Sequence, residues 1–304
     1  MSASGGTRAV VAALLANLGI AVLKLVAFAV TRSSSMLAEG VHSIADSTNQ
    51  ALLLFGAKRS RRDATEKHPF GYGRERFFWS FVVALLLFSV GSLFALYEGW
   101  HKLSDDSPLE RPIVAVGVLL GAIVLESLSF RTAIRESNTL RGDSSWVQFV
   151  RHAKIPELPV VLLEDLAALI GLVLALAGVG LAVLTDDPVW DAYGSLAIGV
   201  LLLVVALVLA VEMKSLLIGE GAGADMEEQI QAALLAGPEV DRVIHLRTMH
   251  LGPEELLVAA KIAVATTSSA TEIARGIDAA EARVRDAVPI ARVIYLEPDL
   301  DRTP

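Results

Sequence analysis

The chain has 304 residues, of which 54% are hydrophobic, and a formal net charge of −8. This composition is too apolar for an ordinary soluble domain and predicts a membrane protein. The acidic balance excludes nucleic acid as a partner, because no basic field is present to attract phosphates. The absence of cysteine excludes disulfides and thiolate metal sites.

Apolar stretches of about 20 residues, long enough to cross a bilayer, recur along the first two thirds of the chain. They predict six transmembrane helices at about Ala9–Val30, Ser34–Ala57, Phe77–Tyr97, Pro112–Phe130, Leu158–Leu184 and Trp190–Val211. The second is the weakest, because the polar motif AEGVHSIADSTNQ at residues 38–50 interrupts it. A strict hydropathy criterion would miss this span.

The loops between the spans differ in charge. Basic residues gather between spans two and three, from Lys58 to Arg76, and between spans four and five, from Arg131 to Lys154. The other loops carry few, so the positive-inside rule places the basic loops in the cytoplasm. With an even number of spans, both termini are expected there too, which suits a multi-pass protein of the cell membrane.

The chain changes character after about Val211. A Gly-rich turn precedes a predicted αββαβ order, which favours a ferredoxin-like α+β domain. The elements are expected at Met226–Leu235, Arg242–Leu251, Leu256–Ala265, Ala270–Ala287 and Ala291–Leu296. Asp225 is the predicted N-cap of the first helix. The sequence therefore predicts a membrane domain at residues 1–215 and a cytoplasmic domain at 216–304.

Ionisable side chains inside the predicted spans are the strongest functional signal. His42 and Asp46 lie one helical turn apart on one face, which is half of a nitrogen and oxygen metal site. Asp165 in span five is a third candidate ligand, and Glu164, about 100° away around the helix, or a water is a candidate for the fourth. Because intramembrane ionisable residues are functional by default, we expect a metal or proton pathway here.

Other polar groups in the spans have a plainer interpretation. Asn17, Lys24, Glu126 and Asp191 are expected to form hydrogen bonds or salt bridges between helices. Two other functional classes are weighed against a transporter. A membrane enzyme would need a nucleophile-activating motif, which the sequence lacks, whereas a passive channel or metal-sensing receptor would lack obligatory proton coupling.

Six motifs in order along the chain resemble the cation diffusion facilitator family, in particular its zinc transporter nine branch. They are MLAEGVHSIADSTNQALL, HPFGYGRERFFW, VVLLEDLAALIG, DAYGSLAIG, SLLIGEGA and LRTMHLGPEELLVAAKI. The resemblance implies a homodimeric six-span transporter that exports zinc, or a similar divalent ion such as manganese, iron or cobalt, against protons. It implies no prosthetic group, and a ferredoxin-like cytoplasmic domain that helps to hold the dimer.

Carried onto this sequence, the resemblance assigns the transport site to His42, Asp46 and Asp165. The family's further histidine in span five falls on Val161, which makes Glu164 the substitute ligand.

Two further family sites are weaker in this chain. A loop site would use His68, but its partner positions fall on Thr65 and Tyr72, so His68 is expected to be structural. In the tail, His245 and His250 should point to opposite faces of one strand. The positions of a regulatory zinc cluster hold Ile244, Ala260 and Tyr295, so the tail domain is expected to be metal-free.

Overall fold

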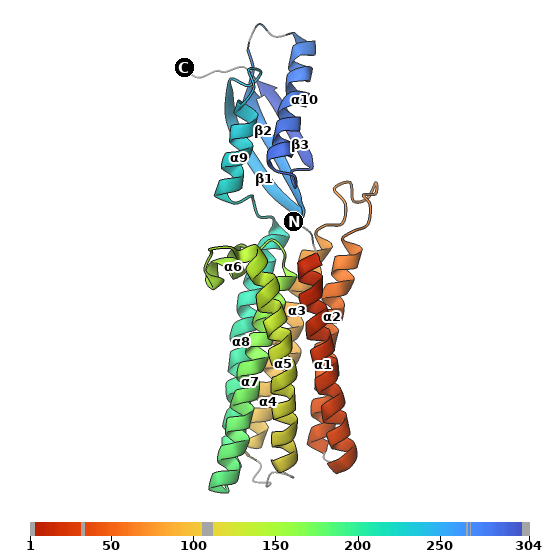
Figure 1. The fold of residues 1–304 in the computed structure, drawn as a ribbon, viewed down its shortest axis with the longest axis vertical. Helices are drawn as coiled ribbons and strands as arrows, with labels where there is room; N and C mark the ends of the chain where they lie inside the picture. The colour runs from red at the N-terminus through yellow and green to blue at the C-terminus, as the bar shows by residue number, and fades with distance from the viewer. Residues whose placement is uncertain (1–3, 32–33, 105–111, 266, 268, 300–304) are drawn as a thin grey trace. The chain divides into compact units, whose positions relative to one another are not determined.

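The computed structural model describes residues 4–31, 34–104, 112–265, 267 and 269–299. Within these ranges it does not describe the side chains at 4–5, 31, 34–39, 41–42, 45 and 88. The chain divides into two compact units (Figure 1). One comprises Met1–Arg59 with Glu75–Lys214, and the other comprises Ser60–Arg74 with Ser215–Pro304.

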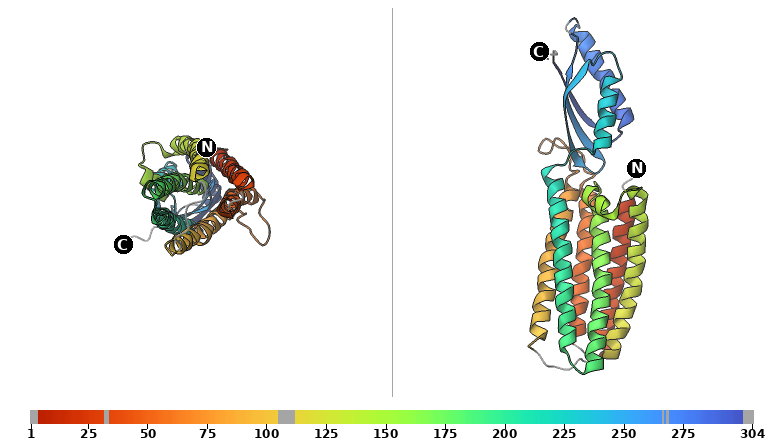
Figure 2. Two further views of the ribbon diagram at one scale, coloured as in Figure 1. Left: turned by 90° about the horizontal axis from the view of Figure 1, so that it is seen from below. Right: turned by 90° about the vertical axis from the view of Figure 1, so that its left-hand side faces the viewer.

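The first unit is a bundle of long helices (Figures 1 and 2). Its long elements are α1 (Ser4–Thr31), α2 (Ser34–Arg59), α5 (Pro112–Arg141), α7 (Glu157–Thr185), α8 (Val189–Ile218) and one continuous run of α3 (Glu75–Leu86), a π-helical segment η1 (Leu87–Ser92) and α4 (Leu93–Lys102). The short α6 (Trp146–His152) connects α5 to α7. The six predicted spans are therefore present, and most extend past their predicted ends because backbone hydrogen bonding continues beyond the apolar stretch.

Low hydropathy separates α2 from its neighbours, although its 26 residues are enough to cross a membrane. In the described part of the chain, five helical runs are long and apolar enough to span a membrane, and α2 is not among them. The reason is the polar motif at its centre, which replaces apolar side chains with ionisable and amide groups. A bilayer tolerates such a helix only where neighbouring helices cover its polar face.

Neighbouring helices do cover it. Helices α1 and α3 pack against α2, and its Ser47, Asn49 and Gln50 are buried. Helix α1 also packs against α5 and α7, and α5 packs against α7.

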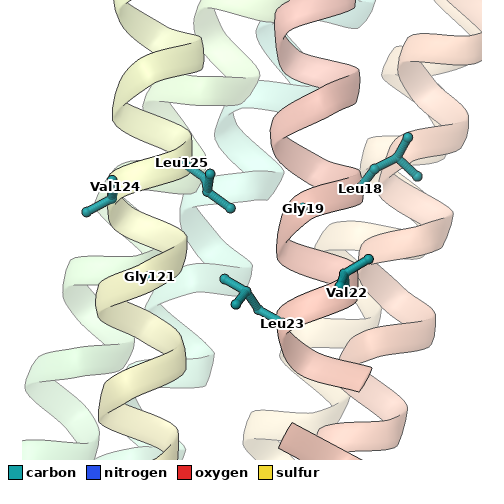
Figure 3. Close-up of a pocket in the computed structure, with 7 residues that line it drawn as sticks. All are labelled: Leu18, Gly19, Val22, Leu23, Gly121, Val124 and Leu125. Atoms are coloured by element: carbon teal, nitrogen blue, oxygen red, sulfur yellow. The ribbon is translucent and has the colours of Figure 1, made fainter. Parts of the chain in front are cut away.

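Helices α1 and α5 approach closely where each carries a glycine (Figure 3). A Cβ on Gly19 would lie 3.0 Å from the Leu125 side chain, and one on Gly121 would lie 3.1 Å from Leu23. Small residues allow membrane helices to pack this tightly, where dispersion replaces the hydrophobic effect.

A buried ion pair joins α3 to α7. The Arg76 guanidinium donates to both carboxylate oxygens of Glu157, at 2.5 Å and 2.7 Å. The two side chains are only 6% and 3% exposed. Each charge is buried together with its partner, so removal of either one leaves the other uncompensated.

The second unit contains a three-stranded sheet with two helices on one face (Figures 1 and 2). Its elements are α9 (Ala224–Leu235), β1 (Arg242–Gly252), β2 (Glu255–Ala263), α10 (Ala270–Ala287) and β3 (Val293–Asp299). β2 pairs antiparallel with β1 and parallel with β3. The core lies between sheet and helices, where Ile230, Leu234, Val258, Ile262 and Val284 are buried. The predicted αββαβ order is confirmed.

Two details of this unit differ from the sequence prediction. The N-cap of α9 is Gly223, so the prediction for Asp225 is wrong. Asp225 lies in the first turn, where a carboxylate still interacts favourably with the helix dipole. In addition, the loop 60–74 belongs with the sheet. Gly73 packs so closely that a Cβ there would lie 2.6 Å from the Leu251 carbonyl oxygen, and the Arg74 guanidinium contacts Met249 Sδ at 3.0 Å.

The buried pair yields a stability prediction. We expect Arg76→Gln to destabilise the membrane unit by about 3–5 kcal/mol, because the Glu157 charge is left buried without its partner. The measurement is the unfolding midpoint of the purified chain in mixed micelles with increasing dodecyl sulfate. The matched control is Arg59→Gln, which breaks a more exposed pair with Glu75 of 3.0 Å. Equal midpoint shifts for both variants would contradict the assigned role.

Candidate metal centre

Polar side chains from α2, α5 and α7 meet inside the membrane unit. Asp46 lies close to the midpoint of α2, and Glu126 lies close to the midpoint of α5. Asp165 lies about 12 Å along α7 from its first residue, at about 1.5 Å per residue. The cluster therefore lies within the helical bundle and about two turns or more from the ends of the helices that carry it, as the substrate sites of transporters do.

Asp165 is held by α5. Its carboxylate is 1% exposed and accepts a hydrogen bond of 2.7 Å from the Ser129 hydroxyl. It also interacts electrostatically with the Glu126 carboxyl group, which is 3% exposed. Two negative charges buried this deeply repel each other, so the pair favours a state in which a proton or a cation accompanies it. Glu126 and Asp165 are thus a candidate proton-holding pair.

Glu164 is held by α2. Its Oε1 accepts a hydrogen bond of 3.0 Å from the Asn49 side-chain amide. Its other oxygen, Oε2, is buried and has no hydrogen bond of ordinary length among the described residues, although the Gln50 side-chain amide of α2 interacts with this carboxylate. A buried carboxylate oxygen without such a bond is costly. It is also the geometry expected of an atom that a cation would contact.

Asp46 and His42 complete the predicted set on α2. The carboxylate of Asp46 is half-buried and interacts electrostatically with Glu126 and Glu164. The backbone of His42 lies one turn earlier in α2, but its side chain is outside the described part of the structure. Among the side chains that are described, no three histidine, aspartate or glutamate residues converge closely enough to form a metal-binding group.

The charge balance of this cluster is unusual for a membrane interior. In the described ranges, no lysine or arginine pairs with Glu126, Glu164 or Asp165. A charged carboxylate in an apolar medium costs several kcal/mol unless it is paired or protonated. These groups therefore need protons, a bound cation, or an exchange between the two.

The other polar residues of the spans divide into two groups. Asn17 on α1 donates to Gln50 on α2 at 3.3 Å, and Asp191 on α8 pairs with Lys102 on α4 at 2.9 Å. Both confirm the predicted interhelical role. Glu126 differs, because its partner is Asp165 of the cluster rather than an inert polar group. A single glutamate in an apolar helix gave no indication of which neighbour it would face.

The position of the family histidine in α7 is filled by a side chain with no ligand atom. Val161 lies one turn before Asp165 and is completely buried. Helix α7 therefore offers carboxylate ligands to the site but no imidazole. Glu164, which the sequence favours as the substitute, is brought to the same cluster as Asp46.

Histidines outside the bundle lie in structural settings. His68 forms a short turn with Thr65, and its ring lies 4.7 Å from that of Tyr72. Thr65 and Tyr72 bond to each other through their hydroxyls at 3.2 Å. On β1, His245 is exposed and His250 is buried, so the two rings lie on opposite faces of the strand, as their spacing predicts.

Comparison with known proteins places this architecture in a family. The family model of the cation efflux transmembrane domain matches residues 10–218. The chain is 33% identical to the proton-coupled zinc antiporter SLC30A9, mitochondrial, of Xenopus laevis over 242 aligned residues. These residues make up 79% of this chain and 43% of that protein. It is 32% identical over 257 residues to metal tolerance protein C4 of Arabidopsis thaliana, which covers 84% of this chain and 56% of that protein.

A bacterial relative is covered more completely. The cation-efflux pump FieF of Yersinia pestis (strain Pestoides F) is 28% identical over 234 residues, which is 76% of this chain and 72% of the pump. By contrast, the chain spans less than half the length of the Xenopus relative. The match of the family model over more than two thirds of the residues is consistent with the helical bundle and the polar cluster. This chain belongs to the cation efflux family, as its motifs predict.

Proposed function

We propose that this protein exports a divalent transition-metal cation, most readily Zn²⁺, from the cytoplasm in exchange for protons. The observation that carries the proposal is the cluster of Glu126, Glu164 and Asp165, which has no basic partner among the described residues. The names of the relatives, which include a zinc antiporter and a cation-efflux pump, support the same class of activity.

Metal ions and protons compete for the same lone pairs at such a site. When a cation binds Asp165, a proton held by the Glu126 and Asp165 carboxyl groups has to leave or move, because the Asp165 oxygens are then occupied. When protons return, the carboxylates lose the charge that holds the cation. Together with a site that opens to one side at a time, this competition couples the flux of the cation to the flux of protons.

The proposed ligands are His42, Asp46, Asp165 and Glu164. One imidazole and three carboxylates suit Zn²⁺ with tetrahedral coordination, and they also suit Mn²⁺, Fe²⁺ or Co²⁺. Glu164 supports its place in the set through its buried Oε2, which lacks a hydrogen bond of ordinary length among the described residues. An exporter of manganese, iron or cobalt by the same mechanism is the second candidate, and it is favoured by the replacement of the span-five histidine by Val161.

Transport requires that the site open to one side at a time. Helices α2 and α7 carry the ligands and are joined by the Asn49–Glu164 hydrogen bond, so rocking of part of the bundle around this point would expose the site alternately. We infer from the positive-inside rule that the basic end faces the cytoplasm, with both termini on that side, in the cell membrane. A channel would conduct without this obligatory exchange.

The ligand assignment predicts a loss of transport. We expect Asp46→Ala and Asp165→Ala each to abolish metal-dependent proton flux in proteoliposomes, because each removes a charged oxygen ligand from a site with few donors. The measurement is the response of an internal pH dye to Zn²⁺, with Mn²⁺, Co²⁺, Fe²⁺ and Cd²⁺ in parallel under a fixed proton gradient.

The matched control is Asp191→Asn, which removes a carboxylate of the same bundle that pairs with Lys102. This variant should retain flux near the wild-type rate. If Asp46→Ala or Asp165→Ala also retains it, the assigned site is wrong. Flux of metal without any proton movement in the wild type would support a channel instead.

Ion selectivity tests the imidazole. We expect His42→Asp to lower the transport of zinc relative to manganese by about tenfold or more, because an oxygen ligand replaces the nitrogen that zinc prefers. Competition between the two ions in the same vesicles gives the ratio directly. An unchanged ratio would mean that His42 does not bind the ion.

The assembly is also a proposal. We infer that the protein is a homodimer in which the second unit associates without metal, because small domains bury a limited fraction of their surface. Its sheet carries helices on one face only, and Tyr295 on the other face is 58% exposed. We expect the full chain to remain dimeric in detergent during sedimentation with a chelator present. Dissociation by the chelator would contradict metal-independent association.

A further inference from the structure

Two pockets on the membrane unit differ in chemistry. The pocket between α1 and α5 is lined by leucine, valine and glycine only, and Leu23 and Leu125 point into it (Figure 3). It offers no polar group that could select one lipid headgroup over another. A second pocket, of about 530 Å³, lies among α5, α6, α7 and α8, and Arg151 is the one charged residue of its lining.

The inner walls of this second pocket are apolar. Helices α5, α7 and α8 contribute Phe130, Ile134, Leu163, Leu166 and Val208. Leu166 and Val208 are 38% and 41% exposed, although both lie within apolar membrane-spanning helices. A cavity with this lining accepts a hydrocarbon chain and excludes ions.

Helix α6 supplies the polar edge. It begins with a capping box between Ser145 and Gln148, and Phe149 anchors it in the bundle. The Trp146 ring lies beside that of Phe149, at 6.3 Å between ring centres, and Trp146 and Val147 are 39% and 64% exposed. Exposed tryptophan is typical of the membrane–water interface. Helix α6 therefore fits a position at the boundary between headgroups and hydrocarbon.

Two arginines, Arg141 and Arg151, give this edge a positive charge. The Arg141 guanidinium lies 4.6 Å from the centre of the Trp146 ring. In the part of the chain that the structure describes, the side chain of Arg151 forms no hydrogen bond or ion pair. Guanidinium groups match phosphate oxygens in a bidentate geometry. Basic pockets between membrane helices on the cytoplasmic side favour anionic headgroups.

We propose that this pocket binds an anionic phospholipid of the surrounding bilayer, with an acyl chain against Leu163, Leu166 and Val208 and the phosphate on Arg151. The site is separate from the cation cluster. Leu163 and Leu166 face a direction roughly 130° around α7 from Glu164, at about 100° per residue. The lipid therefore contacts the helix that carries two proposed ligands without touching the ligands themselves.

Lipid quenching of tryptophan tests this directly. The probe is a chain with Trp146 as its only tryptophan (W79F, W100F and W190F), reconstituted in phosphatidylcholine vesicles with increasing amounts of brominated phosphatidylglycerol. The reference is the same titration with brominated phosphatidylcholine. From the quenching of Trp146, we expect the pocket to prefer phosphatidylglycerol over phosphatidylcholine by about 5-fold, which corresponds to about 1 kcal/mol for one interfacial arginine. Arg151→Gln should bring this preference close to 1.

Two matched pairs of variants make the result specific. Arg135→Gln removes an exposed arginine of α5 that does not line the pocket, and it should leave the preference unchanged. Val208→Phe fills the pocket and should reduce quenching, whereas Val211→Phe, on an exposed position of α8 outside it, should not. Equal losses in both arginine variants, or no loss in Val208→Phe, would overturn the proposal.

A second readout avoids the triple tryptophan replacement. Native mass spectrometry of the otherwise unchanged full chain should show phosphatidylglycerol retained in preference to phosphatidylcholine, and Arg151→Gln should lose this retention. Retention that survives Arg151→Gln would overturn the proposal. Neither readout requires transport, so a failure here is distinct from a failure of the proposed cation exchange.

Discussion

The cost of a carboxylate in a bilayer is the constraint on which this structure depends. Glu126, Glu164 and Asp165 lie deep in a helical bundle, and none pairs with a lysine or arginine in the described ranges. An ordinary membrane protein would avoid them or pair them, as this one does at Arg76–Glu157 and Lys102–Asp191. The contrast within one bundle separates the groups that hold the helices together from those that we propose exchange protons for a cation.

The surrounding polar atoms preserve that state. Ser129 and Asn49 each donate one hydrogen bond, to Asp165 and Glu164 respectively. Neutral donors of this kind orient a carboxylate without cancelling its charge. In the proposed function this leaves the charge available to a cation, whereas a basic residue in their place would have satisfied it permanently. Helix α2 tolerates its polar centre because other helices cover it: α1 packs against it, and Glu164 of α7 accepts a hydrogen bond from its Asn49.

Much of this arrangement could be predicted from the sequence. Six apolar stretches and the αββαβ order of the tail follow from hydrophobic periodicity, which reports on local structure and burial. The importance of Asp46 and Asp165 follows from the cost of ionisable groups at membrane depth. The role of Glu126 does not follow, because one charge in an apolar helix carries no information about the neighbour it faces. The packing of loop 60–74 against β1, the π-helical segment at Leu87–Ser92 and the cap at Gly223 likewise depend on tertiary contacts or local backbone geometry rather than on hydrophobic periodicity.

The central claim is that a cation replaces protons on these carboxylates. Its most direct test is to count the protons released when Zn²⁺ binds the purified protein in weakly buffered detergent, with a pH indicator in solution and the bound metal measured in parallel. The account predicts that at least one proton leaves for each ion bound, and that Glu126→Gln reduces this number because one carboxyl group that can hold a proton is removed from the cluster. Stoichiometric zinc binding with no proton release, in a protein that still transports the metal, would contradict it.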